Sequence, residues 1–120
     1  MTTPTKRIYI ICPVRNVKPE QLELMRAYVR GLKHLGYIVH FPPDDVNQDD
    51  PSGREIVRHH YAAMTAADEV HVFWDKASGG SHWDAGMAYA LGKRFVPVHN
   101  FQSDNYGKSY WKVMGGYANT

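Results

Sequence analysis

The chain has 120 residues, 14 basic and 12 acidic side chains, a formal net charge of +2 and a single cysteine, Cys12. A chain of this length forms one domain, 1–120, that folds without a disulfide or a metal, and a lone cysteine excludes an internal disulfide. It carries no basic cluster suited to polymeric nucleic acid, no signal-like segment and no run of about 20 apolar residues. We therefore expect a cytoplasmic protein that acts on a small molecule, away from membranes.

The first part of the chain predicts two strands joined by a helix. Arg7–Cys12 is a mostly apolar, β-rich run that ends at a proline, which is typical of a parallel strand buried on both faces. Pro19 suits the first position of a helix, and apolar residues repeat at helical spacing from there to about Leu35, where Gly36 follows. Tyr37–Phe41 predicts the second strand.

The middle of the chain predicts a long loop, a helix and a third strand. Residues 42–51 are rich in proline and aspartate and lack periodicity, so we expect a loop that is either a solvated face or a flap over a bound sugar. Ser52 and Glu55 have the spacing of a capping box for a helix that ends near Ala67. Asp68–Trp74 reads as a buried strand.

The last part predicts a loop, a helix, a fourth strand and a short terminal helix. A Gly/Ser-rich loop at Ser78 leads into a helix that runs to Gly92. Arg94–Val98 predicts a strand, and Pro97 places it at an edge of the sheet because proline cannot donate to a ladder. Asn105–Met114 is the candidate for the final helix.

Strands that alternate with helices of this length predict an α/β fold: a single-domain, flavodoxin/Rossmann-like three-layer sandwich with a parallel sheet of four to five strands. The expected strand order is 2-1-3-4, in which the order of the strands along the sheet reverses between the first and third strands. The loop Cys12–Asn16 should then meet the segment Trp74–Asp84 at this crevice.

The most informative stretch is Ser78–Lys93, because it places the carboxylate of Asp84 near the start of a helix. In a first turn, free backbone N–H groups and the helix dipole favour the ionised carboxylate, which would make Asp84 a competent nucleophile. The alternative is purely structural, since Ser81 and Asp84 also have the spacing of a capping box.

Two further side chains are candidates for acid–base work. His60 shares the apolar stripe of its helix, so it is either a core histidine or a general acid that protonates a departing base. Asp75, at the end of the third strand, is a competing acid or an acceptor for a ribose hydroxyl, and otherwise a solvated loop residue.

The loop that contains Ser78, Gly80 and Ser81 is a candidate phosphate cradle, to which Arg15 would add a bidentate contact, although a Gly-rich turn also occurs without phosphate. Aromatic side chains near the strand ends offer either base stacking or core packing, namely Tyr9, Trp74 and Trp83. The histidine and aspartate spacings match no recognised metal site, so we predict neither a metal nor a cofactor.

These motifs resemble the nucleoside 2-deoxyribosyltransferase-like superfamily, which includes the deoxynucleoside monophosphate N-glycosidases. The resemblance covers most of the chain. It rests on Arg15 after the first strand, the Ala67-Asp68 pair, and Ser78 followed six positions later by Asp84 and then Gly86. In that family a carboxylate attacks C1′ of the sugar, the base leaves, and water or a second base resolves the glycosyl-enzyme.

The resemblance assigns roles to individual residues. Asp84 takes the place of the family's nucleophile, usually Glu, and Ser78 that of its phosphate-loop serine. Tyr9 matches a position in the first strand. Ser109 matches a serine that members donate to a neighbouring subunit, which implies a homodimer or higher homo-oligomer.

Two positions depart from the family. His60 stands where the second helix usually carries a catalytic aspartate, and Cys12 with Pro13 stands where the first loop usually has Gly-Ser. The hypothesis is a protein that binds a nucleotide or nucleoside and cleaves or exchanges its N-glycosidic bond. The alternatives are a non-enzymatic sensor of a nucleotide-derived ligand and a TIR-like NAD hydrolase.

Overall fold

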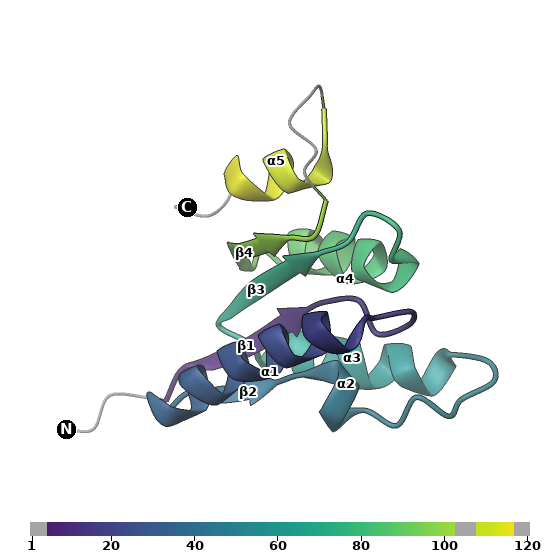
Figure 1. The fold of residues 1–120 in the computed structure, drawn as a ribbon, viewed down its shortest axis with the longest axis horizontal. Helices are drawn as coiled ribbons and strands as arrows, with labels where there is room; N and C mark the ends of the chain where they lie inside the picture. The colour runs from purple at the N-terminus through teal and green to yellow at the C-terminus, as the bar shows by residue number, and fades with distance from the viewer. Residues whose placement is uncertain (1–4, 103–107, 117–120) are drawn as a thin grey trace.

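The computed structural model describes residues 5–102 and 108–116, which form alternating strands and helices around one sheet (Figure 1). The strands are β1 (Arg7–Ile11), β2 (Ile38–His40), β3 (Glu69–Trp74) and β4 (Arg94–Asn100). The helices are α1 (Pro19–His34), α2 (Pro42–Asp45), α3 (Arg54–Ala66), α4 (Gly79–Ala90) and α5 (Tyr110–Gly116).

The sheet confirms the expected topology. Within the described residues it has four strands in the order β2-β1-β3-β4, and every pairing is parallel. β4 is an edge strand, as Pro97 within it predicts. Ile11 pairs with Val72, so the loops that follow β1 and β3 leave neighbouring strands at the same carboxyl edge. The two loops that the sequence singles out therefore lie next to each other at the reversal of strand order.

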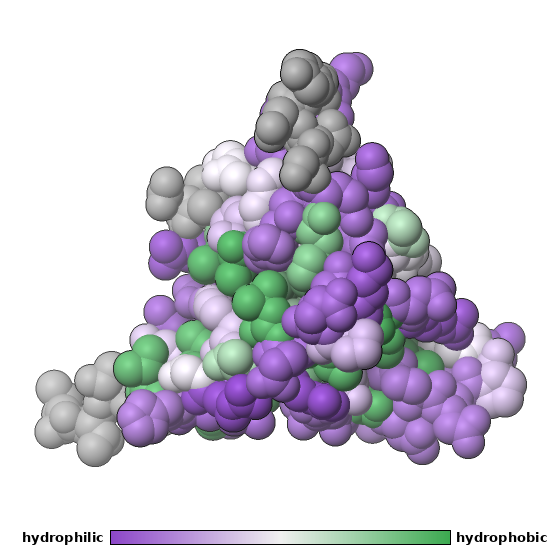
Figure 2. Space-filling model, viewed as in Figure 1, coloured by the Kyte–Doolittle hydropathy of each residue, from purple (hydrophilic) through white to green (hydrophobic). Residues whose placement is uncertain are grey.

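Helices cover both faces of the sheet and enclose two clusters of buried side chains. On one face α1 packs over β1 and β2 through Met25, Val29 and Leu32. On the other face α3, α4 and α5 contribute Met64, Ala88 and Met114 to a second cluster. Figure 2 shows hydrophobic residues near the middle of the face that carries α1, over the part of the sheet formed by β3 and β4. The result is the predicted three-layer sandwich.

A series of polar side chains, of which Glu69 and His71 are buried, connects α1 to β3. Glu69 lies 2.8 Å from Nε2 of His71, and Nδ1 of His71 lies 2.6 Å from the hydroxyl of Tyr28 on α1. Lys6 and Arg94 each lie 3.6 Å from the Glu69 carboxylate. Burial lowers the pKa of His71, so the imidazole is neutral at pH 7 and accepts the proton of Tyr28 while its other nitrogen donates to Glu69.

Two local predictions between β2 and α3 are wrong. The segment expected to be only loop contains the short helix α2, which Pro42 begins at a first helical position. The expected capping box of Ser52 and Glu55 does not form, because Gly53 is the N-cap residue and has a φ of 75°. Asp50 caps α3 instead, since its Oδ2 accepts the backbone N–H groups of Glu55 and Ile56 at 2.8 and 3.4 Å.

At the edge of the sheet where the strands begin, Lys93 links the C-terminal ends of α3 and α4. It follows α4, and its ammonium donates to the backbone carbonyls of Thr65 and Ala67 at 3.0 and 2.7 Å. These carbonyls lie at the C-terminal end of α3. A cation is favourable there because the last carbonyls of a helix lack partners within it.

The short terminal helix expected over Asn105–Met114 appears as α5, which begins at Tyr110, while positions 105–107 lie outside the described residues. Among the helices that the structure describes, none has the length and apolar character needed to cross a membrane.

Candidate active site

Asp84 lies inside the protein, in the second turn of α4. It is the sixth residue of the helix, counted from Gly79, and only 4% of it is exposed. The expectation that it lies in the first turn is wrong, and so is the alternative capping box with Ser81. Ser78 is the actual N-cap, and its hydroxyl accepts the backbone N–H of Ser81 at 3.2 Å. Because a serine cap can begin the helix, the two glycines that look like loop residues belong to its first turn.

Two side chains from other elements hold the Asp84 carboxylate. The hydroxyl of Tyr9 on β1 donates to Oδ2 at 2.8 Å, and Nδ1 of His60 on α3 lies 3.2 Å from Oδ1. Among the residues that the structure describes, each carboxylate oxygen therefore has one side-chain partner, and the three residues come from three separate elements. The free N–H groups of a first turn, expected from the sequence, are replaced here by a phenol and an imidazole.

A second imidazole completes the cluster, and sequence reasoning missed it. His40, the last residue of β2, pairs in register with Tyr9 and stacks on its ring with centroids 5.1 Å apart. Its ring also meets that of His60 edge to face at 6.3 Å. The sequence offered one indication of this role. If the first two predicted strands pair in parallel, Tyr9 lies beside the end of the second strand, where His40 stands.

Both imidazoles retain an unused nitrogen. The Nε2 atoms of His40 and His60 are buried and have no hydrogen-bond partner among residues 5–102 and 108–116. His40 also lines a cavity of about 230 Å³ between β1, β2 and the second half of α3. Because a buried polar atom gains free energy from a hydrogen bond, these two nitrogens are the groups of the cluster most suited to contact a ligand.

Burial sets the protonation of the groups around Asp84. Burial, together with the Asp84 carboxylate, raises the pKa of Tyr9 well above its ordinary value, so the phenol is a neutral donor. The same two causes raise the pKa of Cys12, which makes its thiol a poor nucleophile at neutral pH. Burial lowers the pKa of His40, which is neutral at pH 7. Tyr9 and Cys12 therefore add no negative charge beside Asp84.

The predicted phosphate loop lies at the start of α4, although its serines also bond to each other. The hydroxyl of Ser81 donates to that of Ser78 at 2.9 Å, and Ser81 is buried. Gly80 is exposed in the first turn, where backbone N–H groups have no partner within the helix. Arg15 is exposed in the loop after β1, at the same edge of the sheet.

Two other predicted site residues, Asp75 and Ser109, form hydrogen bonds with residues other than Asp84. Oδ1 of Asp75 accepts the side-chain amide of Gln102 at 2.8 Å and the N–H of Ala77 at 2.9 Å. Ser109 accepts the N–H of Lys112 at 3.2 Å and so caps α5. Within residues 5–102 and 108–116, no group of three or more His, Cys, Asp or Glu side chains is arranged to hold a metal ion.

Comparison with solved structures shows where this fold occurs. The CMP N-glycosidase of Clostridium botulinum aligns with a TM-score of 0.66 and 17% identity, over 95% of this chain and 84% of that chain. A 2-deoxyribosyltransferase of Bacillus psychrosaccharolyticus aligns with a TM-score of 0.64 and 21% identity, over 90% of each chain.

Sequence comparison alone finds neither a matching family model nor a matching curated protein. At these identities the structural likeness is a likeness of fold. The chain thus has the fold found in the nucleoside 2-deoxyribosyltransferase-like proteins that its motifs resemble.

Proposed function

We propose that this protein cleaves or exchanges the N-glycosidic bond of a nucleoside or nucleotide, and that Asp84 is the nucleophile. The observation that carries the proposal is the position of Asp84: a buried carboxylate held by Tyr9 and His60, six residues after a serine-capped helix start. Two proteins with this fold are an N-glycosidase and a deoxyribosyltransferase.

In the first step, a carboxylate oxygen of Asp84 forms a bond to C1′ of the sugar while the bond between C1′ and the base nitrogen breaks. The electron pair of that bond leaves with the base, and the transition state has oxocarbenium character that the anion stabilises. Tyr9 donates to the other oxygen, so the carboxylate keeps a fixed orientation during the attack.

His60 supplies and recovers the proton. With Nδ1 directed at Asp84, the unpartnered Nε2 of a protonated ring donates to the departing base. The neutral ring then accepts a proton through Nε2 from the water or second base that attacks C1′ and releases Asp84. The proton balance closes over the two steps.

Substrate approach follows from the location of the cluster. Both α3 and α4 begin at the carboxyl edge of the sheet, where ligands bind in open α/β sheets. Gly80, Ser78 and Arg15 belong to the segments that follow β3 and β1 at this edge, and a backbone N–H, a hydroxyl and a guanidinium suit a 5′-phosphate. The proposed substrate class is therefore a nucleoside 5′-monophosphate or its parent nucleoside.

The test is chromatographic detection of free base after incubation with a panel of nucleosides, 5′-monophosphates and NAD. Asp84→Asn is compared with the wild type and with Asp68→Asn. Asp68 is a suitable control because it accepts the Arg7 backbone N–H at 2.7 Å, at the opposite edge of the sheet.

We expect base release that Asp84→Asn abolishes and Asp68→Asn preserves, with both variants folded by circular dichroism. Undiminished release in Asp84→Asn contradicts the mechanism. If a nucleotide raises the melting temperature and no base appears, the protein is a binding module. Nicotinamide release from NAD alone identifies the NAD hydrolase alternative.

A further inference from the structure

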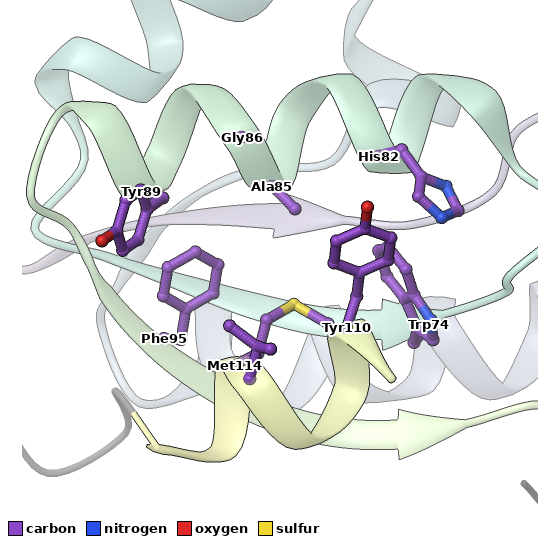
Figure 3. A pocket seen from close by; sticks show the side chains of 9 residues that line it. Trp74, His82, Ala85, Gly86, Tyr89, Phe95, Tyr110 and Met114 are labelled. Atoms are coloured by element: carbon purple, nitrogen blue, oxygen red, sulfur yellow. The ribbon is translucent and has the colours of Figure 1, made fainter. Parts of the chain in front are cut away.

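A second cavity lies beside α4, away from the Asp84 carboxylate. Asp84 reaches Tyr9 on β1 and His60 on α3, whereas this cavity is open to solvent on one side and is lined by residues of α4, α5, β3 and β4. It has a volume of about 380 Å³ (Figure 3). That volume falls at the lower end of the range for small-molecule sites, roughly 300–1,000 Å³.

The floor of the cavity is part of the rigid core. Trp74 on β3, Phe95 on β4 and Met114 on α5 line it, and their exposed fractions are only 3%, 2% and 3%. Side chains that are packed on their other sides into a close-packed interior cannot move to fill the space. The floor of the cavity is therefore fixed.

Three rings make one end of the cavity. The centroid of His82 lies 4.7 Å from that of Trp74 and 5.2 Å from that of Tyr110, and the Tyr110 and Trp74 centroids are 6.4 Å apart. Nδ1 of His82 lies 2.8 Å from the carbonyl oxygen of Ser78, which fixes the ring. Figure 3 shows Phe95 and Tyr89 at the other end. Ring faces and edges at both ends suit a flat aromatic guest.

The lining also indicates the charge of the guest. Among the described residues, those that line the cavity include no Asp, Glu, Lys or Arg. A charged group in this space would lose its hydration without an opposite charge to replace it. Small residues of α4, Ala85 and Gly86, leave room beside the rings.

We propose that this cavity is a binding site for an uncharged, planar heteroaromatic molecule about the size of one bicyclic ring system. The guest ring packs against the exposed ring of Tyr110, above the buried Trp74, and a heteroatom at its edge bonds to Nε2 of His82, whose Nδ1 already contacts Ser78. The site does not depend on the chemistry proposed for Asp84, since no residue of the Tyr9–His60–Asp84 cluster lines it.

Gly86 allows the cavity to be blocked without disturbing the core. It is exposed in α4, and a Cβ atom placed there meets no heavy atom within 4 Å. Gly31 in α1 is a matched control, because it is also an exposed helical glycine where an added Cβ atom meets no heavy atom within 4 Å, and it lies on the other face of the sheet. Both glycines gain helix propensity on substitution.

The experiment is a titration of the full chain, labelled with ¹⁵N, with indole or adenine as probe and with cyclohexanol as a saturated control. Chemical shifts of Trp74, Gly86 and Tyr110 report on the cavity, and those of Tyr9 and His60 on the Asp84 cluster. Gly86→Leu, Gly31→Leu and Tyr110→Ala are titrated in the same way.

We expect saturable chemical-shift changes around the cavity with indole or adenine and none with cyclohexanol. Gly86→Leu and Tyr110→Ala should each lower the affinity for the aromatic probe by at least ten-fold. Gly31→Leu should leave that affinity unchanged. The proposal is overturned if cyclohexanol causes the same shifts as the aromatic probes, if Gly86→Leu and Tyr110→Ala bind the probe as tightly as the wild type, or if no probe causes shifts. Shifts at the same residues that depend on protein concentration alone also overturn it, in favour of a second copy of the chain. Absence of base release in the previous experiment leaves these outcomes unaffected.

Discussion

The hydroxyl of Tyr9 donates a 2.8 Å hydrogen bond to Asp84, and so joins a central strand to a helix across 75 positions of sequence. Both residues are buried, at 0% and 4% exposure. A hydrogen bond to a buried carboxylate contributes more to stability than one between neutral groups. This contact is therefore both a part of the fold and a part of the candidate active site.

Removal of that hydroxyl should destabilise the protein. In Tyr9→Phe the Asp84 carboxylate loses a donor while it stays buried, and we expect the free energy of unfolding to fall by about 1–3 kcal/mol. Tyr61→Phe is the control, because Tyr61 is exposed and its substitution should change stability by no more than about 0.5 kcal/mol. Urea unfolding measures both. Equal stability of Tyr9→Phe and the wild type contradicts the assigned contact.

His60→Gln tests the proposed proton donor. A positioned acid typically accelerates a reaction by about 10²–10⁴-fold, so the variant should release natural bases that much more slowly. Cleavage of a p-nitrophenyl glycoside should slow far less in this variant, because p-nitrophenolate departs without protonation. Single-turnover rates on the two kinds of substrate provide the comparison. An equal loss on both assigns His60 a structural role beside Asp84.

Stability should depend on pH through the buried imidazoles. Burial lowers the pKa of His40 and of His71 in the folded protein, whereas the unfolded chain keeps a value of about 6.5. The unfolded state therefore binds more protons below about pH 6.5, so the free energy of unfolding falls as pH falls through that value and is level above it.

Melting temperatures between pH 5 and pH 8 measure this dependence. His40→Phe keeps a ring beside Tyr9 and removes one titrating group, so its curve should be flatter than that of the wild type. His34→Phe, in the last turn of α1, is the matched control because His34 is exposed. A wild-type slope retained in His40→Phe shows that the imidazole of His40 does not contribute.

The Tyr28 hydroxyl should be coupled to His71. Tyr28→Phe leaves the imidazole with a buried nitrogen that has lost its partner at 2.6 Å, and we expect a loss of about 1–3 kcal/mol. In the His71→Leu background the same change should cost much less, because the partner is already absent. A double-mutant cycle by urea unfolding gives the coupling energy, and additive effects rule out the proposed link.

Arg15 should distinguish a nucleotide from a nucleoside. If its guanidinium holds a 5′-phosphate, Arg15→Gln should lower kcat/KM for the monophosphate by about 10–100-fold and leave the nucleoside unchanged, since a hydrogen bond to a charged group contributes about 1.5–3 kcal/mol. Arg30→Gln is the control, because Arg30 pairs with Glu23 on the surface of α1. The same loss on both substrates removes Arg15 from phosphate binding.

Much of the fold followed from local patterns, whereas the start of α4 did not. Apolar runs identify β1 and β3, and the presence of Pro97 identifies the edge strand, because burial and hydrogen bonding act directly on those residues. Glycines after Ser78 are equally compatible with a loop and a first helical turn. Only the capping contact of Ser78 with Ser81 decides between them, and it moves Asp84 one turn further from the helix start.

In the candidate site, too, residue types could be identified from the sequence, whereas their contacts could not. Tyr9, His60 and Asp84 were individually identifiable by residue type and position, but their convergence depends on the packing of α3 against α4. His40 was missed because a histidine at a strand end has no distinctive local pattern. Its significance comes from the register that places it on the ring of Tyr9.

The bond between Lys93 and the last carbonyls of α3 has a mechanical consequence for the site. It links the C-terminal ends of the two helices that carry His60 and Asp84, whereas both helices begin at the opposite, carboxyl edge of the sheet. A rotation of one helix relative to the other about this end would separate them most near Gly53 and Ser78, where the two helices begin. Such a rotation would uncover the buried Asp84 carboxylate from the carboxyl edge of the sheet, the side on which ligands bind in open α/β sheets.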